Sequence, residues 1–500
     1  MIPNNIEGKQ KKVIVIGAGL GGLSAAISLA QEGYAVEVHD KNEKVGGKLN
    51  VLRKDGFSFD LGPSILTLPH IFERLFTRSQ KKMSDYFSIR LVRPHWRNFF
   101  EDGLVVDLYP EPERMAEEAR KAGESPEAVQ KFLDYSARLY DLVDSGYFEK
   151  GLDNFKEFKD FYGVGKFLQF DLFRTAHSGA ARYLRTKYMR DIFDYFLKYV
   201  GSSAYHSPAF MNCMPTIQFR YDLWYVDGGM YNIALGLKRL MDELGITVHL
   251  KSEVGEIVTE NGRVTGMTTK DGAFHPADIV VSNMEVIPAY RDLLKEDASF
   301  LKSLEKFEPT CSGIVLELGL DIQYPKLAHH NFFFSGDQKR NFKNVFRKRV
   351  LPEDPTIYLV AASKTDPTVA PAGCDGLKIL PHIPHIDDEK PLTREDYGVF
   401  KELVLEKLER MGLKDLRKHV VVEHFWTPLD IREQYYSNKG SIYGVVSDRF
   451  KNFAFKAPKQ STQYENLFFV GGSVNPGGGM PMVVLCGQKV AERIVEWDRR

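Results

Sequence analysis

The sequence predicts an α/β fold, with a Rossmann-like nucleotide-binding domain joined to a second domain of mixed sheet and helices. Residues 12–39 carry a βαβ pattern, in which a buried β-branched strand at 12–16 and an alternating strand at 35–39 flank a glycine turn and a helix. The portion from about 84 to 219 is mainly helical in pattern and rich in aromatic residues. A chain of 500 residues exceeds one ordinary core, so two domains are expected.

Later segments alternate between strand and helix patterns. Strand-like pieces return at 246–281, where Asn-Gly at 261–262 and Asp-Gly at 271–272 predict hairpin turns. The segment 350–390 is rich in proline and aspartate and is expected to form mostly loops. Further strands are expected at 313–319, 356–361 and 467–470, and helices at 394–412 and 481–498.

The composition excludes several classes of function. Lysine plus arginine and aspartate plus glutamate are equal at 67 each, so no net charge attracts nucleic acid and no such partner is expected. The 4 cysteines lie far apart without a CxxC pair, which excludes a disulfide framework and indicates a reduced, cytoplasmic chain. No run approaches the ~18–20 apolar residues of a membrane span, so membrane contact would be peripheral, on the inner face of the cell membrane.

The glycine turn of the βαβ unit has the GxGxxG spacing of a dinucleotide site. Gly17 permits a tight turn, Gly19 lets the backbone approach a pyrophosphate, and Gly22 lets the helix pack on the strand. Phosphates then lie at the helix N-terminus, and Asp40 is placed for a ribose hydroxyl. A plain glycine turn in a packed sheet is the alternative. The predicted contacts here are Gly17, Ala18, Gly19, Gly21, Gly22, Asp40 and Lys41.

A second glycine pair, KVGGK at 44–48, can add backbone donors and positive charge to a diphosphate, the alternative being a solvated turn. It resembles the second diphosphate motif of the FAD-binding amine oxidase and phytoene desaturase superfamily, with lysines in place of two arginines. Other stretches resemble the same superfamily in order: 56–66, 224–230, 253–257, 277–283 and 465–481. The resemblance implies non-covalent FAD with further contacts from Gly47, Lys48, Gly62, Val254, Gly472 and Met480.

The resemblance also implies how the chain divides into domains. The FAD-binding domain would be discontinuous, assembled from residues 10–83, 220–290 and 460–500. The substrate-binding domain would comprise 84–219 and 291–459.

Residues 307–335 resemble bacterial carotenoid desaturases closely. Two segments depart from that pattern: FAFKAPK at 453–459 replaces a usual Arg-Pro, and the terminal signature has Asn475 where desaturases carry histidine, with Met480 and Met482 in place of smaller residues. This variant resembles the diapocarotenoid terminal oxidases, which implies O2-dependent oxidation of the terminal methyl of a C30 polyene to an aldehyde. A carotenoid desaturase stays open as an alternative, as does a non-enzymatic lipid-binding protein like the GDP-dissociation inhibitors.

Candidate substrate-channel residues are Asn475 and Met482, at these departures, and His330, from the pair of adjacent histidines. Adjacent His329 and His330 cannot both face one site in an extended segment, so one is expected toward the cavity and one toward solvent. No carboxylate is spaced to complete a metal-ligand set with them, and no metal site is predicted. No catalytic side chain is named, because a bound flavin would carry the chemistry.

Residues 155–205 hold many aromatic and basic side chains. The stretch 167–174 could form an interfacial amphipathic helix, with its apolar face in lipid and basic residues at anionic headgroups. The alternative is a helical cap with a solvated basic face. A water-insoluble polyene must come from a bilayer, so a membrane-associating region is expected here.

Overall fold

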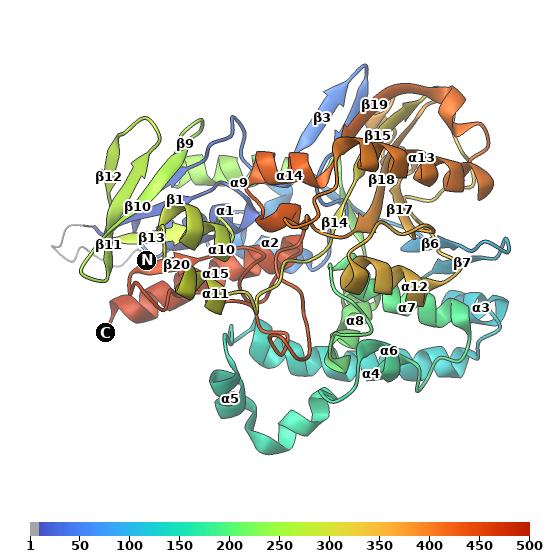
Figure 1. The fold of residues 1–500 in the computed structure, drawn as a ribbon, viewed down its shortest axis with the longest axis horizontal. Coiled ribbons are helices and arrows are strands. Elements are labelled where there is room, and N and C mark those ends of the chain that lie inside the picture. The colour runs from blue at the N-terminus through green and yellow to red at the C-terminus, as the bar shows by residue number, and fades with distance from the viewer. Residues whose placement is uncertain (1–9) are drawn as a thin grey trace.

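A parallel five-stranded sheet forms the centre of one half of the molecule (Figure 1). The computed structural model describes residues 10–500 and, for Val164 and Phe167, the backbone alone. The strand order is β20–β13–β1–β2–β9, and every neighbouring pair is parallel. The strands are β1 (Lys12–Ile16), β2 (Ala35–His39), β9 (Thr247–His249), β13 (Ile279–Ser282) and β20 (Leu467–Phe469). Their nearly continuous apolar sequences suit a sheet covered on both faces.

Helices α1 (Leu20–Gln31) and α15 (Met480–Asp498) pack closely against each other. A Cβ on Gly487 would lie 2.6 Å from the backbone nitrogen of Ala25, so glycine permits this close approach. Ser24 Oγ donates to the carbonyl of Val484 at 2.6 Å across the same contact. Both helices begin at glycine turns, so their N-termini face the site described below.

An antiparallel three-stranded sheet extends this half of the molecule. It consists of β10 (Val254–Glu260), β11 (Arg263–Thr269) and β12 (Phe274–Pro276). The turns predicted at 261–262 and 271–272 connect these strands, and both residues of the first turn have positive φ, as a two-residue hairpin turn requires.

A mixed sheet forms the second half, in the order β19–β15–β18–β17–β16–β6–β7 with β14 paired to β18. Its strands are β6 (Trp96–Phe99), β7 (Val105–Leu108), β14 (Ser312–Gly313), β15 (Val315–Leu320), β16 (His330–Phe333), β17 (Ile357–Val360), β18 (Asp375–Ile383) and β19 (Val420–Trp426). The expectation of mostly loops in 350–390 was wrong, because β18 is a nine-residue central strand. Its Lys378, Pro381 and His382 hid a strand pattern, although all three side chains are buried.

A helical region lies below the second sheet in Figure 1. The mainly helical prediction for 84–219 missed β5 (Ile89–Leu91), β6 and β7, which are only three or four residues long and each include a charged residue. The region's helices are α3 (Pro112–Lys121), α4 (Pro126–Val143), α5 (Phe155–Phe167), α6 (Ala176–Ala180), α7 (Lys187–Tyr199) and α8 (Met214–Tyr221). The remaining strands and α-helices are β3 (Val51–Lys54), β4 (Phe57–Asp60), β8 (Trp224–Val226), α2 (Pro69–Thr77), α9 (Asn232–Glu243), α10 (Val286–Pro288), α11 (Ala298–Ser303), α12 (Gln338–Lys343), α13 (Arg394–Arg410) and α14 (Pro428–Tyr435).

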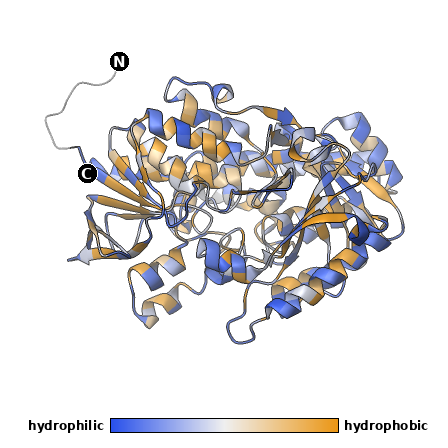
Figure 2. Ribbon diagram, turned by 90° about the horizontal axis from the view of Figure 1, so that it is seen from above, coloured by the Kyte–Doolittle hydropathy of each residue, from blue (hydrophilic) through white to orange (hydrophobic). Residues whose placement is uncertain are grey.

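Hydrophobic residues concentrate along the strands, whereas the outer helices carry both polar and apolar residues (Figure 2). The arrangement of a parallel nucleotide-type sheet, a second mixed sheet and a helical region confirms the predicted fold class. Within residues 10–500, no helix combines the length and the apolar character needed to cross a bilayer.

Candidate cofactor and substrate cavity

An elongated cavity of about 680 Å³ lies between the parallel sheet and the second sheet. One end is lined by Asp40, Glu253 and Val254, and the middle by the glycine turns before α1 and α15. The other end is lined mostly by apolar and aromatic side chains: Trp96, Phe196, Tyr199, Met211, Met214, Tyr358, Leu380 and Val445. A polar end joined to an apolar end suits a nucleotide cofactor and a hydrocarbon substrate in contact with each other.

The first glycine turn approaches the second one closely. A Cβ on Gly47 would lie 3.0 Å from the Cα of Gly19, and a Cβ on Gly19 would lie 2.7 Å from Asn283 Nδ2. Gly17 has a φ of +97°, and a Cβ on Gly22 would lie 2.0 Å from the carbonyl oxygen of Gly17. These glycines leave the N-terminus of α1 open to the cavity, as an anion site requires.

The predicted Asp40 lies at the end of β2 and lines the cavity. Its carboxylate accepts hydrogen bonds from the backbone N–H groups of Ala18 and Asn42, both at 2.7 Å. Burial raises the pKa of Asp40, although these two N–H groups lower it. Each carboxylate oxygen can accept a second bond, so the group can bind a hydroxyl while it fixes the glycine turn. Lys41 lines the cavity and lies over the ring of Tyr436 at 4.3 Å.

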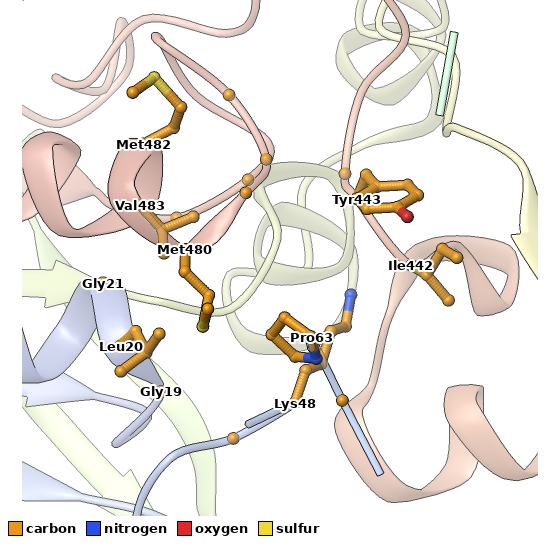
Figure 3. A pocket seen from close by; sticks show the side chains of 18 of the residues that line it. Gly19, Leu20, Gly21, Lys48, Pro63, Ile442, Tyr443, Met480, Met482 and Val483 are labelled. Atoms are coloured by element: carbon orange, nitrogen blue, oxygen red, sulfur yellow. The ribbon is translucent and has the colours of Figure 1, made fainter. Parts of the chain in front are cut away.

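Lys48 has a protein partner in the cavity wall. Its Nζ lies 3.2 Å from Glu285 Oε1 and donates to the carbonyl of Ser441 at 3.1 Å. Figure 3 shows its side chain beside Pro63, below Tyr443. A diphosphate would therefore share this ammonium with Glu285, which limits the charge that Lys48 can offer.

The remaining predicted cofactor contacts also reach the cavity. Val254 opens β10 at the polar end, and Gly62 lies close to Lys48, whose carbonyl oxygen would be 1.7 Å from a Cβ on Gly62. A Cβ on Gly472 would lie 2.6 Å from the carbonyl oxygen of Tyr443. Met480 begins α15, and its side chain extends toward Pro63 (Figure 3).

A buried cluster of ionisable residues under Gly62 was not predicted. Lys378 of β18 donates to the Gly62 carbonyl and, at 3.1 Å, to Ser64 Oγ. Burial lowers the pKa of Lys378, raises that of Asp60 to about 6 and raises that of Glu317 to about 8. Neither carboxylate oxygen of Glu317 has a hydrogen-bond partner within the described part of the chain. The cluster joins β4, β15 and β18, so no local sequence pattern could reveal it.

Asn475 was predicted in the substrate channel, but its side chain is fully buried beside the cavity and does not line it. Its Oδ1 accepts a hydrogen bond from the Tyr147 hydroxyl and another, at 2.9 Å, from the backbone N–H of Lys456. Its Nδ2 donates to the carbonyl of Asp153 at 3.0 Å. Tyr147 and Lys456 both line the cavity, so Asn475 acts on the channel through them. Met482, in contrast, lines the cavity.

The two histidines differ from expectation. Both His329 and His330 are buried, so neither faces solvent. His329 Nδ1 lies 2.7 Å from Thr365 Oγ1, and His330 Nδ1 lies 3.0 Å from the hydroxyl of Tyr358. Tyr358 lines the cavity while His330 lies behind it. The mixed sheet buries both faces of β16, and the sequence of that strand alone does not show this.

A possible metal-ligand group lies near the polar end of the cavity. Glu37, His39 and His275 place candidate ligand atoms within 4.8 Å of one another. Glu37 is already paired with Lys12 at 2.9 Å. The prediction of no metal site considered the four cysteines and the histidines at 329–330, and it did not foresee this group.

Comparison with known proteins identifies the family. The model of the flavin containing amine oxidoreductases matches residues 20–313. The chain belongs to this family. A 4,4'-diapolycopene oxygenase of Methylomonas sp is 58% identical over 487 residues, covering 97% of this chain and 98% of that protein. A 4,4'-diaponeurosporene oxygenase of Staphylococcus haemolyticus is 50% identical, covering 97% of each.

The solved structure of a putrescine oxidase has the same fold, with a TM-score of 0.66 at 14% identity, covering 98% of this chain and 99% of that one. The protein is thus a flavin enzyme, and FAD is its cofactor. The cavity fits FAD, because two glycine turns and the N-terminus of α1 surround its middle, where a diphosphate needs backbone donors and room.

Proposed function

We propose that the protein is an FAD-dependent carotenoid oxygenase that oxidises the terminal methyl of a C30 diapocarotenoid to an aldehyde with O2. The observation that carries the proposal is the 58% identity, over nearly the whole chain, to a 4,4'-diapolycopene oxygenase. One methyl group and one O2 give one aldehyde and one water, so the overall reaction balances without another reductant. FAD, when bound, supplies the redox chemistry.

The cavity supports this proposal in two ways. The eight side chains named above at its apolar end offer a long hydrocarbon aromatic and aliphatic contacts, and none of the eight carries a charge. The residues proposed to hold FAD, of which all but Ala18 and Gly22 line the cavity, are Gly17, Ala18, Gly19, Gly21, Gly22, Asp40, Lys41, Gly47, Lys48, Gly62, Val254, Gly472 and Met480. The domain division stays a proposal as well, with the FAD-binding strands drawn from three separate segments of the chain.

Mass spectrometry with isotopically labelled O2 tests the reaction. Purified, FAD-loaded enzyme is given 4,4'-diaponeurosporene in vesicles, and we expect an aldehyde whose oxygen carries the label. A product with additional double bonds and no oxygen would assign the protein to the desaturases instead. A protein that binds the polyene but changes it under no condition would favour the lipid-binding alternative.

We further propose peripheral binding to the inner face of the cell membrane through an apolar patch formed by Leu168, Phe173, Phe450 and Phe453. Each of these side chains is at least 67% exposed. Arg449 donates to the carbonyl of Phe173 at 2.6 Å, which joins the two segments of the patch. Ala454 lines the cavity directly after Phe453, so the patch lies where a polyene could pass from lipid into the protein. The patch extends beyond the 155–205 region into the loop before residue 455.

A further inference from the structure

A buried amine lies in the cavity beside the second glycine-rich turn. Lys456 is 5% exposed and lines the cavity. A Cβ on Gly477 would lie 3.0 Å from Lys456 Cε, so the side chain runs alongside the turn that leads into α15. Its Nζ donates to Ser447 Oγ at 2.7 Å. Within residues 10–500, no carboxylate forms an ion pair with this amine.

Both partners of this contact are fixed in place. The backbone N–H of Lys456 donates to Asn475 Oδ1 at 2.9 Å, and Asn475 is itself held by Asp153. Ser447 is held on both sides: its N–H donates to Ser202 Oγ at 3.0 Å, and its carbonyl accepts from Ser207 Oγ at 2.7 Å. The amine and the hydroxyl therefore form a preorganised polar pair in the cavity wall.

A hydrocarbon alone does not explain this pair. Val445 and Ala454, which line the cavity and precede Ser447 and Lys456 by two residues each, are apolar. A buried ammonium that lacks a charged partner costs free energy, and burial lowers the pKa of Lys456 to about 7. An unoxidised polyene offers the amine no acceptor. An oxygen atom at the end of the polyene does.

We propose that Lys456 and Ser447 form a binding subsite for the oxygen at the oxidised end of the polyene, either the hydroxyl of an alcohol or the carbonyl of an aldehyde. This inference rests on the proposed function. An alcohol is the oxidation level between a methyl group and an aldehyde. A hydrogen-bond donor that binds an oxygen atom but not a hydrocarbon would keep the alcohol in the cavity until the alcohol is oxidised to the aldehyde. It would also make the enzyme bind polyenes that already carry an oxygen more tightly than the hydrocarbon.

The product distribution of full-length, FAD-loaded Lys456→Met tests the subsite. Methionine keeps the length and apolar stem of lysine but removes the donor. We expect the ratio of terminal alcohol to aldehyde to rise about tenfold or more, as for the loss of a hydrogen bond from a charged donor. Each alcohol that leaves has used two electrons that its oxidation to the aldehyde would have returned, so the assay contains a two-electron reductant for the flavin, and the two products are compared at equal consumption of the hydrocarbon. Lys456→Arg keeps the donor and should retain a ratio near that of the wild type, and exposed Lys390→Met is the matched control.

Binding provides a second readout that does not depend on turnover. Quenching of flavin fluorescence measures affinity for a C30 polyene and for its terminal aldehyde. The wild type should bind the aldehyde about tenfold more tightly than the hydrocarbon, and the Lys456→Met and Ser447→Ala variants should both bind the two compounds with similar affinity. If both variants keep the alcohol-to-aldehyde ratio and the aldehyde preference of the wild type, the subsite is overturned. It is also overturned if the variants alter the flavin spectrum but neither of these two quantities, because the amine would then interact with the flavin. A wild type that adds no oxygen would overturn the proposed function, and this inference with it.

Discussion

The side-chain oxygen of Asn475 accepts a hydrogen bond from the backbone N–H of Lys456 at 2.9 Å. The two segments in which this sequence departs from the carotenoid desaturases, 453–459 and the terminal signature, therefore touch each other. Asn475, which differs from the desaturase pattern, holds the backbone of Lys456, which lies in the other differing segment. Both differences therefore affect the same wall of the cavity. Asn475 does not line the cavity, but it forms hydrogen bonds with two residues that do, Tyr147 and Lys456.

Asn475→Ala should destabilise the protein by about 3 kcal/mol. The buried N–H of Lys456 and the hydroxyl of Tyr147 would each lose their acceptor, and an unsatisfied buried donor costs about 1–3 kcal/mol. Urea denaturation measures the loss. The matched control is Asn154→Ala at the exposed start of α5, where loss of a helix cap should cost about 1 kcal/mol. Equal losses in the two variants would contradict a special role for Asn475.

Gly19→Val should abolish FAD retention. The new Cβ alone would lie 2.7 Å from Asn283 Nδ2, and the rest of the side chain would fill the space between Gly19 and Gly47. The ratio of flavin to protein absorbance after purification gives the result. Gly398→Val on α13, where a Cβ meets nothing within 4 Å, should purify with full flavin. A yellow Gly19→Val protein would show that this turn does not hold the diphosphate.

A structural feature can be predicted from the sequence when the residues that form it lie close together in the chain. The βαβ unit and its glycine turn were predictable, because strand pattern, turn and helix N-terminus lie within thirty residues of each other. β18 was missed because its inward Lys378 and His382 hide the apolar pattern. The cluster of Lys378, Glu317 and Asp60, and the contact between Asn475 and Lys456, depend on strands and turns that only tertiary packing brings together. A motif can locate such residues, but it cannot say which of them touch.

The apolar patch predicts loss of vesicle binding when its aromatic residues are replaced. Phe173→Ser with Phe450→Ser removes two large exposed apolar side chains, each worth about 1.5–3 kcal/mol when buried. The partition coefficient between vesicles and water, measured by co-sedimentation, should fall by at least about tenfold. Val399→Ser on α13 removes a similarly exposed apolar side chain outside the patch and should leave binding unchanged. Because Arg182 and Lys187 already pair with Asp171 and Asp191, reversing their charges should matter less. If all variants partition equally onto vesicles, the patch does not bind the membrane.

Glu317 predicts a specific dependence of stability on pH. Burial raises its pKa to about 8 in the folded protein, whereas in the unfolded chain it titrates near the ordinary ~4.3. The folded state thus holds a proton that the unfolded state has lost, so this contribution to stability is complete below pH ~4.3 and disappears as pH rises to about 8. Glu317→Gln cannot ionise, and its Tm should fall less than that of the wild type over this range. Exposed Glu389→Gln is the control. Parallel Tm curves for all three proteins would contradict a protonated Glu317.

The methionines of the terminal signature should determine which carbon of the polyene reaches the flavin. Met480 is buried and extends toward Pro63, whereas Met482 lies on the other side of the first turn of α15, so together they fill two parts of the cavity (Figure 3). Met480→Val with Met482→Gly would leave open space that long apolar side chains now occupy. Oxidation of the chain end should fall about tenfold, the discrimination expected from small changes in an apolar pocket.

The same change should admit desaturation, because interior carbons of the polyene could then pass the flavin. Chromatography with mass spectrometry distinguishes the products: added oxygen marks end-group oxidation, and loss of hydrogen alone marks a new double bond. Met411→Val, at the end of α13 and outside the cavity, is the control and should keep the wild-type products. If the double variant retains both the rate and the products of the wild type, the depth of the substrate must be set elsewhere along the channel, and the residues that narrow its apolar end, such as Tyr358 and Trp96, become the ones to change.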